Sequence, residues 1–236
     1  MASYTKEEVY EILKNKIINF EIEPGTQMGE IDTSEEYHLS RTPIRDVFKK
    51  LEENDLLEII PHVGTFVSLM DISSFNNTLY VREKLEISII EDLMVTLSPN
   101  DILILEDIIF RQIQFIKDYN PKENNKNIIL QKALEFISLD DEFHKTMFKL
   151  TGKEGIWNHL FEKDLLYRRF RIYLNTLPNS NMPTLVEEHK ELLDAIIEKN
   201  KEKTIMLMSK HIYGGIRQVG SEKINQHFFK KWESKV

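Results

Sequence analysis

The chain has 236 residues, of which 41% are hydrophobic and 30% charged, the balance of a folded globular protein rather than a disordered one. It contains no cysteine, which excludes disulfide scaffolds, thiolate metal sites and cysteine nucleophiles. The net charge of −8 argues against a nonspecific nucleic-acid coat protein. No stretch reaches the roughly 18 apolar residues that a membrane helix needs, and no signal pattern opens the sequence, so we expect no membrane partner and a cytoplasmic location.

Three helices are predicted in the first part of the chain. Apolar residues at helical spacing predict a helix from Val9 to Phe20, and a short polar helix follows at about 32–38. Ser40 is expected to cap a third helix, with Pro43 in its first turn, where the missing N–H has no cost. This helix should end near Asn54.

A β-hairpin is predicted directly after the third helix. Two β-branched runs, at 56–60 and 65–69, flank a turn that contains Pro61 and Gly64. Three helices followed by a hairpin are typical of a winged helix-turn-helix. We therefore assign residues 1–70 to a DNA-binding domain.

The start of the third helix carries the side chains that suit DNA. Arg41 and Arg45 lie one turn apart on one helix face, where two guanidinium groups can reach base edges and phosphates in a major groove. The hydroxyls of Ser40 and Thr42 suit a phosphate, and Gly64 allows the wing to approach a minor groove. The residues that we expect to contact DNA are Ser40, Arg41, Thr42, Arg45, Lys49 and Gly64. The alternative is that these arginines form an ordinary solvated face.

The charge distribution weighs against extensive DNA contact. Residues 1–70 carry 7 Lys and Arg against 14 Asp and Glu, a net charge of −7, whereas residues 71–236 carry 24 against 25. Any DNA binding must therefore use a local basic patch, and we expect it to be sensitive to salt.

From about residue 74 onward, only helical periodicity appears. Helices are predicted at 79–97, 101–117, 128–150, 156–174, 184–198 and 202–219. The fold class is therefore mostly α, with an all-α antiparallel bundle of six or seven helices in a second domain, residues 71–225. In the tail, residues 226–236, the aromatic residues Phe228, Phe229 and Trp232 could dock on a partner or close the bundle.

A possible metal site lies in the second domain. Asp140 and His144 are four residues apart and share a helix face. His189 and His211 are equally far from the break at Asn200-Lys201, so antiparallel packing should bring them to similar heights. One carboxylate and three imidazoles can hold a divalent first-row metal. The alternative is that these are core or surface histidines.

The first domain resembles a known family. The runs Pro24-Gly25, Ser40-Arg41-Thr42-Pro43-Ile44-Arg45 and Gly64-Thr65-Phe66-Val67 are similar, in order and spacing, to the N-terminal domain of GntR-family bacterial transcriptional regulators. The resemblance implies that Arg41 and Arg45 read double-stranded operator DNA, with Gly64 at the wing.

The second domain resembles the FCD domain, the effector domain of the FadR branch of that family. The segments that carry the likeness are Arg82-x-x-Leu85-Glu86, Asp140-x-x-Phe143-His144, Glu188-His189 and Lys210-His211. The resemblance implies that Asp140, His144, His189 and His211 ligate a divalent metal ion, such as Zn, Ni or Mn.

A ligand-responsive regulator is the function that these two resemblances imply. We expect a homodimeric repressor that is not an enzyme and whose bundle binds the metal and a small organic acid. Arg82 and the cluster of Arg168, Arg169 and Arg171 could clamp the effector's other oxygens, and Arg82, Arg168 and Arg169 are the residues assigned. Alternatively, Arg82 simply pairs with Glu86. Competing hypotheses are a metal-sensing regulator, a metal-dependent hydrolase or lyase, and a structural bundle without DNA affinity.

Overall fold

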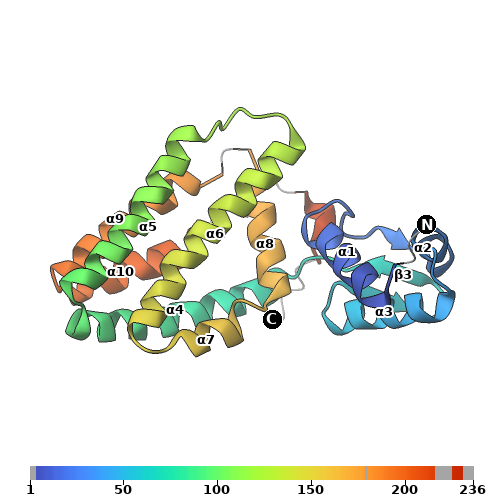
Figure 1. Ribbon diagram of the computed structural model, residues 1–236, viewed down its shortest axis with the longest axis horizontal. Coiled ribbons are helices and arrows are strands. Elements are labelled where there is room, and N and C mark those ends of the chain that lie inside the picture. The colour runs from blue at the N-terminus through green and yellow to red at the C-terminus, as the bar shows by residue number, and fades with distance from the viewer. Residues whose placement is uncertain (1–3, 179, 216–224, 231–236) are drawn as a thin grey trace, which may run out of the picture.

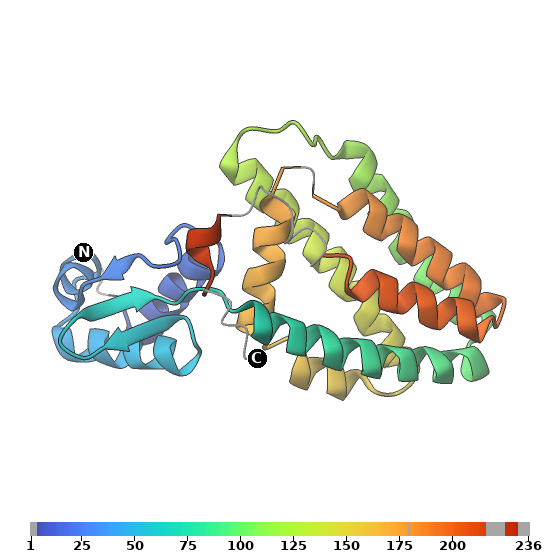
Figure 2. The same ribbon diagram turned by 180° about the vertical axis from the view of Figure 1, so that it is seen from behind.

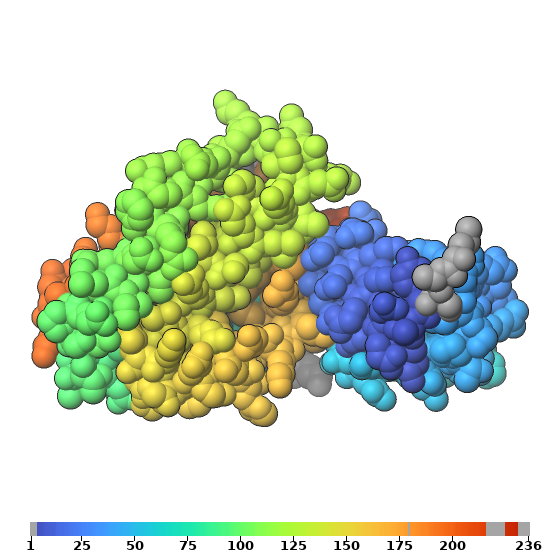
Figure 3. Space-filling model, in the orientation of Figure 1, coloured from blue at the N-terminus to red at the C-terminus, as the bar shows by residue number. Residues whose placement is uncertain are grey.

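The chain folds into two parts that lie side by side (Figure 1). The computed structural model describes residues 4–178, 180–215 and 225–230. The N-terminal part holds the first three helices and the strands, and the C-terminal part holds the remaining long helices (Figures 1 and 2). The space-filling view shows the two parts meeting along one side (Figure 3).

The N-terminal part is the predicted winged helix-turn-helix. Its elements in chain order are α1 (Lys6–Ile18), β1 (Gln27–Met28), α2 (Glu30–Tyr37), α3 (Arg41–Glu53), β2 (Leu57–Ile60) and β3 (Gly64–Val67). Helix α1 begins at a capping box in which Thr5 and Glu8 satisfy each other's backbone N–H groups. The apolar face of α3 is buried, with Ile44 and Leu51 fully covered. Each such side chain contributes about 1.5–3 kcal/mol through burial.

The strands form a three-stranded antiparallel sheet in the order β1-β3-β2. The hairpin is as predicted, with Leu57 opposite Val67 and Ile60 opposite Gly64. Strand β1 was not predicted, because two residues are too few to show an alternating pattern.

Seven helices form the bundle in the part of the chain that the structure describes. They are α4 (Ile72–Thr96), α5 (Pro99–Asp118), α6 (Lys126–Leu150), α7 (Glu154–Leu160), α8 (Leu165–Thr176), α9 (Met182–Ile197) and α10 (Lys201–Ile212). Ser98 and Asp101 form a capping box at the start of α5, and Pro99 lies in its first turn. None of the described helices is long and apolar enough to cross a membrane.

Two helix predictions need correction. The single helix expected at 156–174 is two helices, because the Asp164 side chain accepts the backbone N–H of Tyr167 and starts α8 anew. The apolar periodicity hid this break, since Trp157 and Phe170 are buried on either side of it. Helix α10 ends at Ile212, and residues 216–219 of the predicted helix lie outside the described residues.

The tail returns to the boundary between the two parts. Phe228 and Phe229 pack against the rings of Phe20 and Tyr173, and Trp232 lies outside the described residues. Phe20 follows α1, and Tyr173 belongs to α8. Within the described part, the tail therefore contacts both the winged domain and the bundle.

Candidate functional site

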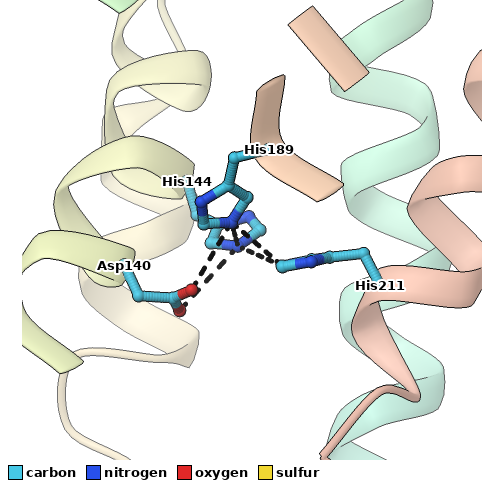
Figure 4. A group of neighbouring side chains, drawn as sticks. All are labelled: Asp140, His144, His189 and His211. Atoms are coloured by element: carbon cyan, nitrogen blue, oxygen red, sulfur yellow. Dashed lines mark hydrogen bonds and ion pairs between the residues drawn. The ribbon is translucent and has the colours of Figure 1, made fainter. Parts of the chain in front are cut away.

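Four side chains from three helices converge in the middle of the bundle (Figure 4). Asp140 and His144 come from α6, His189 from α9 and His211 from α10. All four are buried, and one ligand atom from each lies within 4.8 Å of the others. The structure thus brings together the four residues that the spacing suggested.

The distances between the imidazoles fit a single cation. The Nε2 atoms of His144 and His211 are 3.1 Å apart, those of His189 and His211 3.1 Å, and those of His189 and His144 3.3 Å. Nitrogens about 2.1 Å from one cation, at angles of about 90 to 110°, lie about 3.0 to 3.4 Å apart. The nearest Asp140 oxygen is 3.4 Å from Nε2 of His189.

The outer nitrogen of each imidazole faces an acceptor. Nδ1 of His144 lies 2.5 Å from Glu86, Nδ1 of His189 lies 2.9 Å from Oε1 of Gln112, and Nδ1 of His211 lies 3.2 Å from Glu188. Each acceptor holds the proton on Nδ1 and leaves a lone pair on Nε2.

The positions of the imidazole protons show whether the three histidines could hold a metal ion. Three Nε2 lone pairs face one another at hydrogen-bond distance, and none of the three atoms then has a proton to donate. Such a cluster of acceptors is unfavourable in a buried site unless a cation lies among them. The donor set, three nitrogens and one carboxylate oxygen, suits a divalent first-row metal.

Electrostatics keep the ligands in the protonation states that a metal needs. Burial alone raises the pKa of the Asp140 carboxyl, but Arg171, whose Nη2 lies 2.6 Å from Oδ2, outweighs it and holds that pKa well below its ordinary value. Burial lowers the pKa of His144 and lowers that of His189 further, so both imidazoles are neutral at pH 7. Burial also raises the pKa of Glu86, but Arg82 and His144 outweigh it and bring that pKa to about 2.

A small cavity of about 60 Å³ adjoins the cluster. It is lined by Arg82, Asp140, Tyr167, Arg171 and His211, among other residues. Arg82 lies 2.6 Å from Glu86 through Nε and donates to Tyr167 through Nη1, whereas its buried Nη2 has no hydrogen-bond partner. The ion pair considered for Arg82 is thus present, and one donor group is left over at the cavity.

The other two arginines assigned to an effector lie elsewhere. Arg168 is exposed, and Arg169 donates through Nη1 to Ser68 at the boundary with the winged domain. Arg171 is the member of this cluster that reaches the metal ligands. Residues 169 and 171 are about 200° apart around a helix, so they cannot share one site.

The supporting residues Gln112 and Glu188 were not found from the sequence. Glu188 directly precedes His189, so its position beside a candidate ligand could have suggested that it accepts a hydrogen bond from a neighbouring imidazole. Gln112 lies 77 residues before His189 in the chain, and nothing local connects them.

The residues expected to contact DNA gather at the start of α3 and at the wing. Ser40, Arg41, Thr42, Arg45 and Lys49 are exposed, and the Ser40 side chain makes no capping hydrogen bond, which leaves its hydroxyl available. Gly64 begins β3 with a φ of 150°, and a Cβ there would lie 2.7 Å from Nε2 of Gln27. The Gln27 side chain could move away, so it is the φ, which other residues rarely adopt, that accounts for a glycine at the wing.

Arg45 is engaged within the domain. Its Nε and Nη2 donate to Oε1 and Oε2 of Glu30, on α2, at 3.1 and 2.9 Å. The hydrogen bond from Arg45 is the main cause that lowers the pKa of Glu30, so this residue is a carboxylate beside the proposed DNA-reading face.

Comparisons with known proteins cover most of the chain. Residues 5–67 match the profile of bacterial regulatory proteins of the gntR family, and residues 78–214 match that of the FCD domain. The chain is 24% identical over 220 residues to the HTH-type transcriptional repressor RspR of Escherichia coli K12, covering 92% of this chain and 90% of RspR. It is 27% identical over 194 residues to an HTH-type transcriptional regulator in an unstable DNA locus of Streptomyces ambofaciens, covering 82% of this chain and 75% of that protein.

Solved structures share the fold. Escherichia coli McbR/YncC aligns with a TM-score of 0.55 at 16% identity, covering 90% of this chain and 95% of its own. A Listeria monocytogenes protein, Lar, aligns with a TM-score of 0.57 at 14% identity, covering 92% and 97%. The family profiles and the sequence relatives are those of regulators of transcription, in agreement with the expectation that the chain is not an enzyme.

Proposed function

The chain belongs to the gntR family of bacterial regulatory proteins, in the FadR branch that carries an FCD domain, and from this premise we propose how it works. It is a ligand-responsive DNA-binding regulator. As a homodimer it represses transcription in the cytoplasm, with Ser40, Arg41, Thr42, Arg45, Lys49 and Gly64 contacting operator DNA and the bundle holding a divalent metal and a small organic acid.

The single observation that supports the metal is the set of three converging lone pairs. Asp140, His144, His189 and His211 would hold the ion, and Gln112, Glu86 and Glu188 keep the imidazoles in the required tautomer. Bound there, a divalent cation supplies open coordination positions for a carboxylate oxygen.

The local charge supports an anionic effector. Two buried or nearly buried arginines, Arg82 and Arg171, stand against three buried carboxylates, Glu86, Asp140 and Glu188. Lys210, paired with Glu188, and Asp141, paired with Arg171, add one charge of each sign and leave this sum unchanged. A divalent ion changes the net charge from −1 to +1, which an organic acid then neutralises. Arg82, with its unpartnered Nη2 beside the cavity, is the residue best placed to hold that acid.

The cavity's size limits the effector. About 60 Å³ admits a few water molecules or a small acid, and a larger ligand would need the helices to move apart. Because an effector changes DNA affinity only if it binds the two arrangements unequally, such a movement would supply the switch.

The DNA-binding proposal is tested with a labelled duplex from the region upstream of the gene that encodes this chain. The double variant R41A/R45A should lose at least about tenfold in affinity, because two phosphate or base contacts disappear. The control K149A/K190A removes two exposed positive charges from the bundle and should bind like the unaltered chain. Equal affinity of R41A/R45A would remove these arginines from DNA recognition.

The alternative that the metal itself is the signal remains open to a direct experiment. Metal content is measured by mass spectrometry, and DNA affinity is compared before and after chelation. A metal-sensing regulator loses or gains DNA affinity on chelation without any acid, whereas our proposal requires the response to a small carboxylate in the metal-loaded protein.

A further inference from the structure

The described tail segment, residues 225–230, is bonded to the linker between the two domains. The backbone N–H of Met70 donates to the carbonyl of Phe228 at 2.8 Å, and the N–H of Lys230 donates to the carbonyl of Met70 at 2.9 Å. The N–H of Asn225 donates to the Tyr173 hydroxyl at 2.9 Å. We call residues 225–230 the strap, because they join the linker to helix α8 of the bundle.

The strap also contacts the winged domain through aromatic rings. Phe228 stacks on Phe20 with ring centroids 6.2 Å apart, and Phe229 lies 5.6 Å from Phe170 and 5.5 Å from Tyr173. Phe20 has a φ of 61°, a left-handed conformation that is unfavourable for a bulky side chain. Phe20 directly follows the C-cap of α1, where a left-handed residue lets the N–H of Glu21 donate to the carbonyl of Lys16. Its ring then packs on the winged core on one side and on Tyr173 and Phe228 on the other.

A buried charge opposes this docking. Arg169 is 1% exposed and lies between the domains, where Nη1 donates to the Ser68 carbonyl at 2.9 Å and to its hydroxyl at 3.1 Å. Nε and Nη2 of Arg169 have no hydrogen-bond partner, and no ion pair of Arg169 is found among the described residues. The guanidinium carbon of Arg169 lies 5.5 Å from the centre of the Phe20 ring, a favourable contact, but no carboxylate neutralises the charge. A buried guanidinium without a carboxylate is destabilising, and water would satisfy Nε and Nη2 if the domains separated.

We propose that the strap is a releasable latch: it holds the winged domain against α8, and the unpaired charge of Arg169 favours the released arrangement. On release, the bonds to Met70 and the ring contacts of Phe228 and Phe229 are lost, Arg169 becomes hydrated, and the winged domain reorients relative to the bundle. For DNA binding, which rests on the proposed function, the latch determines how two winged domains match paired half-sites.

The absence of cysteine allows a direct test in the full chain, without DNA or metal. Cysteines introduced at Glu53, on α3, and Lys149, on α6, are both exposed and take spin labels uniquely. Labelled chain is diluted with unlabelled chain, and the distance distribution is measured by pulsed electron resonance.

If the strap is a latch, the distribution of distances between the two spin labels should be narrow in the unaltered chain. In F228A/F229A its width should be at least twofold larger. K230P removes the N–H that donates to Met70 without touching a ring, and it should broaden the distribution, whereas K230A keeps that N–H and should not. F110A, which removes an exposed ring on α5, is the control for loss of an aromatic side chain.

Arg169→Met tests the opposing charge. Added to F228A/F229A, it should narrow the distribution again, since an apolar side chain of similar length favours the docked arrangement. The proposal is overturned if F228A/F229A and K230P are as narrow as the unaltered chain, with helix content unchanged by circular dichroism, or if R169M leaves the broadened distribution unchanged. Because no DNA or metal is used, a failure of the proposed function would not affect this result.

Discussion

Oε1 of Gln112 lies 2.9 Å from Nδ1 of His189, and the other end of the same amide fixes its orientation. Nε2 of Gln112 donates to the carbonyl of Leu139 at 2.9 Å, so the oxygen must face the imidazole. His189 therefore carries its proton on Nδ1, and its Nε2 is free to bind a cation. This single amide connects α5 to the metal site.

Replacing Gln112 by Met should weaken metal binding about 10- to 100-fold, because the variant keeps the side-chain length but loses the acceptor that sets the His189 tautomer. Competition with a chromogenic chelator measures the affinity. An unchanged affinity in Q112M would show that the tautomer does not depend on this amide. Q114A, on the same helix and only partly buried, is the control.

Glu30→Gln should strengthen DNA binding about two- to fivefold, because the carboxylate holds Arg45 and repels phosphates. The affinity for the upstream duplex is measured by fluorescence anisotropy at one fixed salt concentration. Glu35→Gln removes an exposed negative charge from the same helix and serves as the control. If both variants gain equally, the effect belongs to net charge and not to release of Arg45.

Arg171→Met should destabilise the metal-free protein by about 3–5 kcal/mol, because it leaves the buried Asp140 carboxylate without its partner. Bound metal should reduce this loss, since the cation then faces the same carboxylate. Urea unfolding with and without metal gives both values. Arg111→Met, which removes a half-exposed arginine paired with Glu142, should cost less than about 1 kcal/mol in either condition.

The metal-free protein should lose stability as pH falls from 7 to 5. His144 and His189 have a folded pKa below the ordinary 6.5, so the unfolded chain binds more protons than the folded one through this range. The free energy of unfolding therefore falls on acidification, by at most about 1.4 kcal/mol per pH unit for each histidine. Urea unfolding in the presence of a chelator at several pH values measures the slope.

His189→Gln should make this slope shallower, because one of the two groups no longer titrates. A slope that is the same in H189Q would mean that His189 has the same pKa in the folded and unfolded chain, and that burial does not lower it.

Local signals predicted much of the fold. The start of α3 at Ser40 and the turn at Gly64 are each encoded within a few residues, and both elements formed as expected. The break before α8 was missed because buried side chains on both sides continue the helical period across it.

The convergence of the four candidate metal ligands could be predicted for a similar reason, whereas the residues that support them could not. Asp140 and His144 share a helix face by spacing alone, and His189 and His211 mirror each other across one tight turn. Gln112 and Arg171 act through helix packing between distant parts of the chain, which no local pattern records. The place of Arg169 at the domain boundary is likewise a product of packing.

The winged domain carries a net charge of −7, and four of its seven basic side chains, Arg41, Arg45, Lys49 and Lys50, lie on α3. Most of its surface therefore repels a duplex, and attraction depends on one correctly oriented end of one helix. We expect such a protein to stay only briefly at random genomic positions, and to search the chromosome by repeated dissociation rather than by long one-dimensional sliding. Its occupancy of a control region then depends on specific contacts between α3 and the base sequence of the operator. Nonspecific electrostatic attraction to DNA, on which most nucleic-acid-binding proteins rely, contributes little.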